Sequence, residues 1–323
     1  MGYFENAFKG LNHWWRYIVV IIAIALGYTI GQIPLQLALW RAMDEEGSNL
    51  GFEDLEAFEA NPDFGIFGIN SNMGFTLLLL MFLGAITAFF FIFKPLHNRE
   101  FRTLVTAGSR IRWNRTFFAF FIWLLLTLGI EGVFYLVDPG NYSFHFKLNT
   151  FIPLVIISVF ILPIQTSMEE LLFRGYLMQG IGIASKSRWL SLIITSVLFG
   201  LIHILNPEVQ EFGFGVMMIY YISAGLLLGI ITIMDDGLEL ALGLHAATNL
   251  AGSVFFGYEG AAIQTDSLLQ THEINPTMMT AGFIGVSIVF VLIMKYKYKW
   301  GSFNRLIEPI SKPDDTVVMN QFA

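Results

Sequence analysis

Long, uninterrupted apolar runs alternate with short polar segments along most of the chain. A helix needs about 20 mostly apolar residues to cross the hydrocarbon core of a bilayer. We interpret eight stretches as membrane-spanning helices: roughly 17–39, 74–93, 116–137, 150–183, 189–205, 212–234, 238–256 and 277–294. These runs lack the alternating polarity of barrel strands. The pattern therefore predicts an all-α, polytopic membrane protein.

The fourth stretch, 150–183, is too long for one straight span and contains Pro163. Proline removes a backbone donor and clashes with the preceding turn, so a broken or kinked fourth helix is expected. The first stretch is too long for a signal-peptide core and lacks a small-residue cleavage site, so it should stay attached. No internal repeat or long linker divides the sequence. Residues 1–323 are therefore expected to form a single membrane domain.

Composition supports the membrane assignment. The chain has 323 residues, of which 55% are hydrophobic and only 13% charged, whereas about 25% of the residues of an average soluble protein are charged. The absence of cysteine excludes disulfides and cysteine-ligated metal sites. The net charge of -7 provides no basic surface for nucleic acid.

The distribution of basic residues predicts the orientation. If the N-terminus lies inside, 15 of the 18 lysines and arginines fall on the inner side of the eight spans. Inner loops of membrane proteins carry such an excess. Both termini are therefore expected to be cytoplasmic. The first outer loop, 40–73, is rich in acidic residues, and we interpret it as a solvated loop.

Ionisable residues inside a span are costly and need a reason. In the segment 167–176, Glu170 and Arg174 are four residues apart, so they share a helix face and can neutralise each other. Glu169 points about 100° away and has no local cation. We regard it as a candidate proton acceptor. Glu131 stands alone in the third span, and we interpret it as an interhelical contact.

Two histidines also lie within predicted spans. His203 follows Phe199 by one helical turn, and Asn249 follows His245 by one turn, so each pair shares a helix face. Glu169 and His203 lie equally far from the turn at 184–188, about 22 Å along antiparallel helices. We therefore expect the acidic, imidazole and amide groups to converge inside the membrane.

Three short motifs follow one another: Glu-Glu-x-x-x-Arg (Glu169, Glu170, Arg174), Phe-x-x-x-His (Phe199, His203) and His-x-x-x-Asn (His245, Asn249). In this order, within apolar helices, they resemble the CAAX prenyl endopeptidase and bacteriocin-processing family, often called CPBP or Abi proteins. The resemblance covers about 150–256, which would form the catalytic core.

The resemblance implies an intramembrane endopeptidase acting on a membrane-associated or lipidated peptide or protein, in a bacterial plasma membrane. It implies that Glu169 and His203 activate a water molecule, and that His245 and Asn249 stabilise the oxyanion. This agrees with the residues themselves, because peptide hydrolysis needs a base and donors for the developing negative oxygen. We assign supporting roles to Glu170, Arg174 and Phe199.

The sequence alone leaves open whether the site holds a metal ion and whether the protein is an enzyme. Glu169, His203 and His245 could hold a zinc ion with an open position, but the HExxH motif is absent, and the family equally resembles metal-independent glutamate proteases. The alternative functions are a non-catalytic membrane scaffold or bacteriocin-immunity protein, and a proton-coupled transporter using buried Glu and His. Many transporters contain internal repeats with paired broken helices.

Overall fold

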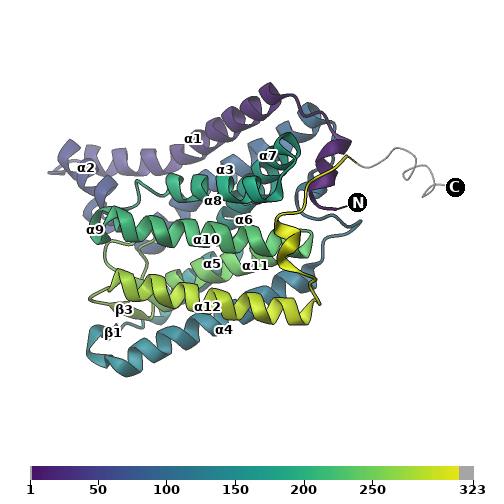
Figure 1. The fold of residues 1–323 in the computed structure, drawn as a ribbon. Coiled ribbons are helices and arrows are strands. Elements are labelled where there is room, and N and C mark those ends of the chain that lie inside the picture. Colours follow the sequence, from purple (N-terminus) through teal and green to yellow (C-terminus); the bar gives the residue numbers. More distant parts are fainter. Residues whose placement is uncertain (1, 313–323) are drawn as a thin grey trace.

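The computed structural model describes residues 2–312, whose regular structure is almost entirely helical (Figure 1). The α-helices are α1 (Trp14–Asp44), α2 (Phe52–Ala60), α3 (Ser71–His97), α4 (Trp113–Val137), α5 (Leu148–Phe160), α6 (Leu162–Glu170), α7 (Met178–Ser185), α8 (Arg188–Ile202), α9 (Pro207–Phe212), α10 (Phe214–Asp235), α11 (Glu239–Leu250) and α12 (Pro276–Lys297). The 3₁₀ turns are η1 (Phe4–Lys9), η2 (Phe64–Phe67), η3 (Phe101–Leu104), η4 (Pro139–Asn141) and η7 (Phe303–Leu306), and the π-helical segments are η5 (Leu171–Leu177) and η6 (Ala251–Phe255). The strands are β1 (Tyr142–Phe144), β2 (Phe256–Tyr258) and β3 (Leu269–Thr271).

Six helices are long and apolar enough to cross a membrane: α1, α3, α4, the consecutive run from α5 to α7, α10 and α12. The structure thus confirms the all-α, multi-pass architecture. The predicted spans at 189–205 and 238–256 form the shorter helices α8 and α11, of 15 and 12 residues. At 1.5 Å per residue, 15 residues cover only about 22 Å of the ~30 Å core. The predicted count of eight full spans is therefore not confirmed.

The fourth predicted span is broken, as expected from its proline. Helix α5 ends at Phe160, and α6 begins at Leu162 with Pro163 in its first turn. A proline is tolerated there because its missing N–H would have no partner within the helix. Directly after Glu170 the helix widens into the π-helical segment η5. Single π turns inside α-helices are frequent at functional sites.

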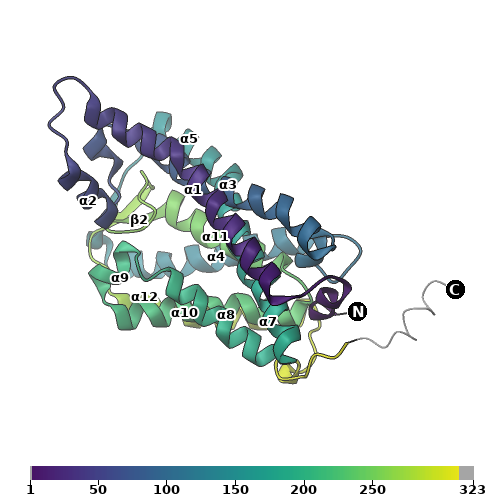
Figure 2. The ribbon, with the colours of Figure 1, turned by 90° about the horizontal axis from the view of Figure 1, so that it is seen from above.

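The helices form two packed groups with α11 between them. Helix α1 lies along α3, while α10 packs against α8 and α12 (Figures 1 and 2). Helix α11 contacts α4, α6 and α10. One apolar cluster includes Phe89 and Tyr176, and a second includes Trp123 and Phe290. The short helix α11 is therefore surrounded by other helices, which explains how a 12-residue helix with polar side chains is accommodated.

The two ends of the bundle differ. At one end lie α2, α9 and a small sheet of strand order β1-β3-β2, with β3 antiparallel to β1 and parallel to β2 (Figure 1). At the other end, the segment around η1 docks into the bundle: the Tyr3 hydroxyl donates to the carbonyl oxygen of Leu104, and the Tyr3 N–H donates to Asp236. Ser187 forms a β-bridge with Pro309 at this same end. The first and last described residues thus lie together.

We expect this shared end to face the cytoplasm, because it holds most of the basic residues. A topology reporter fused at residue 60, in α2, and a second fused at the C-terminus should then report opposite sides of the membrane. Paired enzymatic and fluorescent reporters would measure this in cells. Reporters found on the same side would contradict the predicted topology.

Candidate active site

Glu170 and Arg174 form the predicted ion pair. Arg174 Nη1 donates to Glu170 Oε1 over 2.7 Å, and both side chains are fully buried. The guanidinium also donates from Nη2 to the carbonyl oxygen of Gly225 on α10. It lies over the ring of Phe199, 4.2 Å from the ring centroid. Arg174 thus connects η5 to both α8 and α10, and its charge is neutralised locally.

His245 lies between the two adjacent glutamates. Its Nδ1 is 2.8 Å from Glu170 Oε1, the same oxygen that binds Arg174. Its Nε2 is 3.6 Å from Glu169 Oε2. A carboxylate that accepts from one ring nitrogen fixes the orientation of the imidazole and directs the other nitrogen. Glu170 therefore orients His245 toward Glu169, a contact between α6 and α11 that sequence spacing did not predict.

Gln165 links Glu169 to Asn249. The Gln165 side-chain amide donates to Glu169 Oε1, and its carbonyl oxygen accepts from Asn249 Nδ2 over 2.8 Å. Sequence analysis missed Gln165, although it precedes Glu169 by one turn, on the same face of an apolar helix. The other carboxylate oxygen, Glu169 Oε2, is buried without a hydrogen-bond partner among the described residues.

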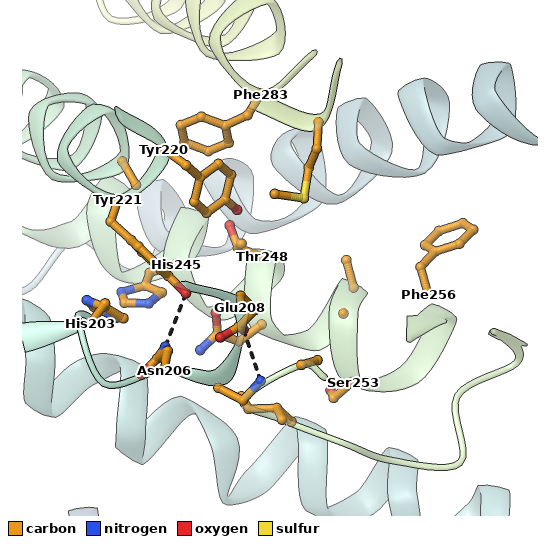
Figure 3. Close-up of a pocket in the computed structure, with 18 of the residues that line it drawn as sticks. His203, Asn206, Glu208, Tyr220, Tyr221, His245, Thr248, Ser253, Phe256 and Phe283 are labelled. Carbon is orange, nitrogen blue, oxygen red and sulfur yellow. Dashed lines mark hydrogen bonds between the residues drawn. The ribbon is translucent and has the colours of Figure 1, made fainter. Parts of the chain in front are cut away.

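His203 follows the last residue of α8 and is held from two sides. Its Nδ1 donates to the carbonyl oxygen of Phe199 over 2.6 Å, so in the neutral ring Nε2 carries the lone pair. The imidazole stacks on Tyr221, with 4.3 Å between ring centroids and 18° between planes. The Tyr221 hydroxyl accepts from Asn206, which fixes the tyrosine in turn (Figure 3).

Close helix packing places His245 and Asn249. A Cβ at Gly243 would lie only 2.0 Å from the carbonyl oxygen of Thr116, so α11 can approach α4 this closely only with glycine there. One turn beyond His245, Thr248 accepts a 2.7 Å hydrogen bond from the indole of Trp123 on α4. These two contacts fix the depth and rotation of α11.

The four candidate catalytic residues, Glu169, His203, His245 and Asn249, line one cavity of about 1240 Å³. This exceeds the usual 300–1,000 Å³ of small-molecule pockets. The cavity extends to β1, β3 and the start of α12 at the sheet end of the bundle. Glu131, interpreted from the sequence as an interhelical contact, also lines it. The arrangement brings together residues from α6, α8 and α11 at a space large enough for a peptide segment.

The donor set does not fit a catalytic zinc site. Within residues 2–312, no group of three His, Asp or Glu side chains is placed to share a metal ion. Glu169 Oε2 and His245 Nε2 lie 3.6 Å apart and could supply two ligands, while His203 lines the same cavity without completing such a group. Catalytic zinc usually has three protein ligands.

Comparison with known proteins finds similarity in the segment that contains these residues. Residues 148–251 match the family described as Type II CAAX prenyl endopeptidase Rce1-like. This segment of the chain is therefore similar to the CAAX prenyl endopeptidase family. The matched segment contains all three motifs. YyaK, an uncharacterized protein of Bacillus subtilis (strain 168), is 29% identical over 301 residues, covering 93% of this chain and 97% of the relative. The comparison with solved structures found no significant match. The six long apolar helices, together with the similarity to a membrane-embedded protease family, support a multi-pass membrane protein.

The different surroundings of the two glutamates predict different effects on stability. Glu170→Gln should lower the unfolding temperature, because Arg174 and His245 lose a buried acceptor; breaking a buried ion pair costs about 3–5 kcal/mol. Glu169→Gln, the matched control, should unfold close to wild type, since it removes no arginine partner. Thermal unfolding in detergent, followed by circular dichroism, measures both. Equal unfolding temperatures for the two variants would refute this distinction.

Proposed function

We propose that this protein belongs to the CPBP family and is an intramembrane endopeptidase that hydrolyses a peptide bond of a membrane-associated or lipidated peptide or protein. The observation that carries the proposal is the environment of Glu169. Glu169 lines the cavity, and its Oε1 accepts a hydrogen bond from Gln165. Its Oε2 is buried and has no hydrogen-bond partner among the described residues. A buried unpaired acceptor is unfavourable and is expected where a reaction requires it.

Two hydrogen-bond acceptors of the same cavity, on Glu169 and His203, would activate a water molecule. Glu169 Oε2 would accept a proton from a water molecule, and the lone pair of His203 Nε2 offers a second acceptor for the same water. The hydroxide attacks the carbonyl carbon of the scissile bond, and the proton held by the site passes to the departing amine. Groups in such positions contribute about 10²–10⁴-fold to the rate as general acid and base.

Stabilisation of the oxyanion falls to α11. Asn249 has two amide hydrogens and uses one on Gln165, which leaves the other for the substrate oxygen. When both ring nitrogens of His245 carry protons, Nδ1 donates to Glu170 and Nε2 is the second donor. These donors are held by hydrogen bonds before substrate binds, so little reorganisation is needed during the reaction.

The proposal predicts that Glu169→Gln abolishes cleavage without unfolding the protein, because the amide cannot accept the proton. Purified protein in detergent would be assayed against a peptide library by mass spectrometry. Exhaustive chelation should leave wild-type activity intact, since within residues 2–312 Glu169, His203 and His245 are not placed as a three-ligand metal site. A scaffold or a transporter would cleave nothing even as wild type, and a fully active Glu169→Gln enzyme would exclude the assigned base.

The oxyanion assignment makes a separate kinetic prediction. Asn249→Ala should lower kcat by about 10²–10³, the value of one such donor. KM should change little, because the interaction strengthens only in the transition state. Steady-state kinetics on a cleaved library peptide would test this, and a variant that turns over at the normal rate would remove Asn249 from the mechanism.

A further inference from the structure

The charged side chains that line the cavity are acidic, apart from the two histidines. They are Glu131, Asp138, Glu169, Glu208 and Glu273, with His203 and His245; no lysine or arginine of the described chain lines it. A concave site lined by one sign of charge, with walls of low dielectric constant, raises the local concentration of ions of opposite sign. The proposed mechanism uses only one of these acids, Glu169.

Glu208 stands out among the remaining acids. It lies in the first turn of α9, only five residues after His203, and 6% of its surface is exposed. Its Oε1 accepts from the backbone N–H of Ala262 at 2.9 Å and from the Tyr258 hydroxyl at 3.5 Å. Its Oε2 is buried with no hydrogen-bond partner in the described part of the chain. Figure 3 shows the side chain inside the cavity, in the same view as His203.

The surroundings of Glu208 offer no positive charge. Burial raises the pKa of this carboxyl group, and the nearby charge of Glu211 acts in the same direction. A buried carboxylate is costly unless a cation pairs with it. Burial thus favours the neutral form of this carboxyl group, and a cation entering the cavity from outside the protein would stabilise its ionised form.

The walls beside Glu208 suit an organic cation. Tyr220 and Tyr221 of α10 line this part of the cavity together with Tyr258 (Figure 3). Aromatic faces attract ammonium and guanidinium groups. Tyr221 also stacks on His203, so this region adjoins the proposed catalytic residues.

We propose that Glu208 binds a lysine or arginine side chain of the peptide substrate near the scissile bond, and that it sets specificity for a basic residue. This inference rests on the proposed function, which makes the occupant of the cavity a peptide. The charge-assisted hydrogen bonds would use Oε2, the oxygen without a partner.

Binding to an inactive protein tests the inference without requiring cleavage. Glu169→Gln protein in detergent would be titrated with two fluorescent pools of apolar peptides. One pool has a fixed lysine, and the other has the neutral N-ε-acetyl-lysine at the same position. Fluorescence anisotropy should show about tenfold tighter binding of the lysine pool, or about 1.4 kcal/mol. Equal affinities for the lysine and acetyl-lysine pools would overturn the proposal, and this test needs no substitution of Glu208.

A second substitution assigns the preference to one residue. Adding Glu208→Gln to the Glu169→Gln protein should abolish the preference for lysine. Adding Glu211→Gln is the matched control, because Glu211 is an exposed glutamate of the same helix that does not line the cavity. It should leave the preference intact. A preference that survives Glu208→Gln would also overturn the proposal.

Cleavage by the wild-type protein separates this inference from the proposed function. Hydrolysis of both pools at equal rates would support the protease and overturn the role of Glu208. Tighter binding of the lysine pool without hydrolysis of either pool would support Glu208 as a cation-binding residue and contradict the protease.

Discussion

The rest of the site depends on the neutralisation of one buried carboxylate, that of Glu170. In the interior of a membrane protein an unpaired charge is untenable, so its partners must be held in place. A single oxygen of Glu170 accepts from Arg174 and from His245. Through Arg174 the constraint extends to Gly225 on α10 and to the ring of Phe199 on α8. One charged group thereby fixes the relative positions of α6, α8, α10 and α11.

This constraint gives neighbouring glutamates opposite properties. Glu170 is fully buried away from the cavity and binds Arg174 and His245 through Oε1, whereas Glu169, one residue earlier, is turned by about 100° around the helix axis and lines the cavity. The hydrogen bond from Gln165 holds one oxygen of Glu169 and leaves the other available. A π-helical turn begins immediately after this pair. Two consecutive residues thus have different roles: Glu170 stabilises the packing of the helices, and Glu169 is the proposed base.

Interactions within one helix and the convergence of Glu169, His203 and His245 could be predicted from the sequence, but the specific hydrogen bonds between helices could not. The break before Pro163 and the pairing of Glu170 with Arg174 depend on spacing along the chain. The hydrogen bond between Gln165 and Asn249 depends on how closely α6 and α11 approach each other. A single glutamine in the sequence does not predict that approach. Glu208 escaped notice because it lies in a short polar connection, where sequence suggests solvent. The predicted count of eight spans is not confirmed for a related reason, since α8 and α11 are apolar like spanning helices but have only 15 and 12 residues.

The buried Tyr3 has a consequence for how the protein is made. Its hydroxyl donates to the carbonyl oxygens of Leu104 and Arg174, and its N–H donates to Asp236, which is 233 residues later in the chain. The ribosome synthesises Tyr3 long before these acceptors, and the last of them emerges only after α10 is complete. The N-terminal segment must therefore wait undocked during most of translation. Its docking is therefore a late step of assembly, after the segments that carry the first two motifs have been synthesised.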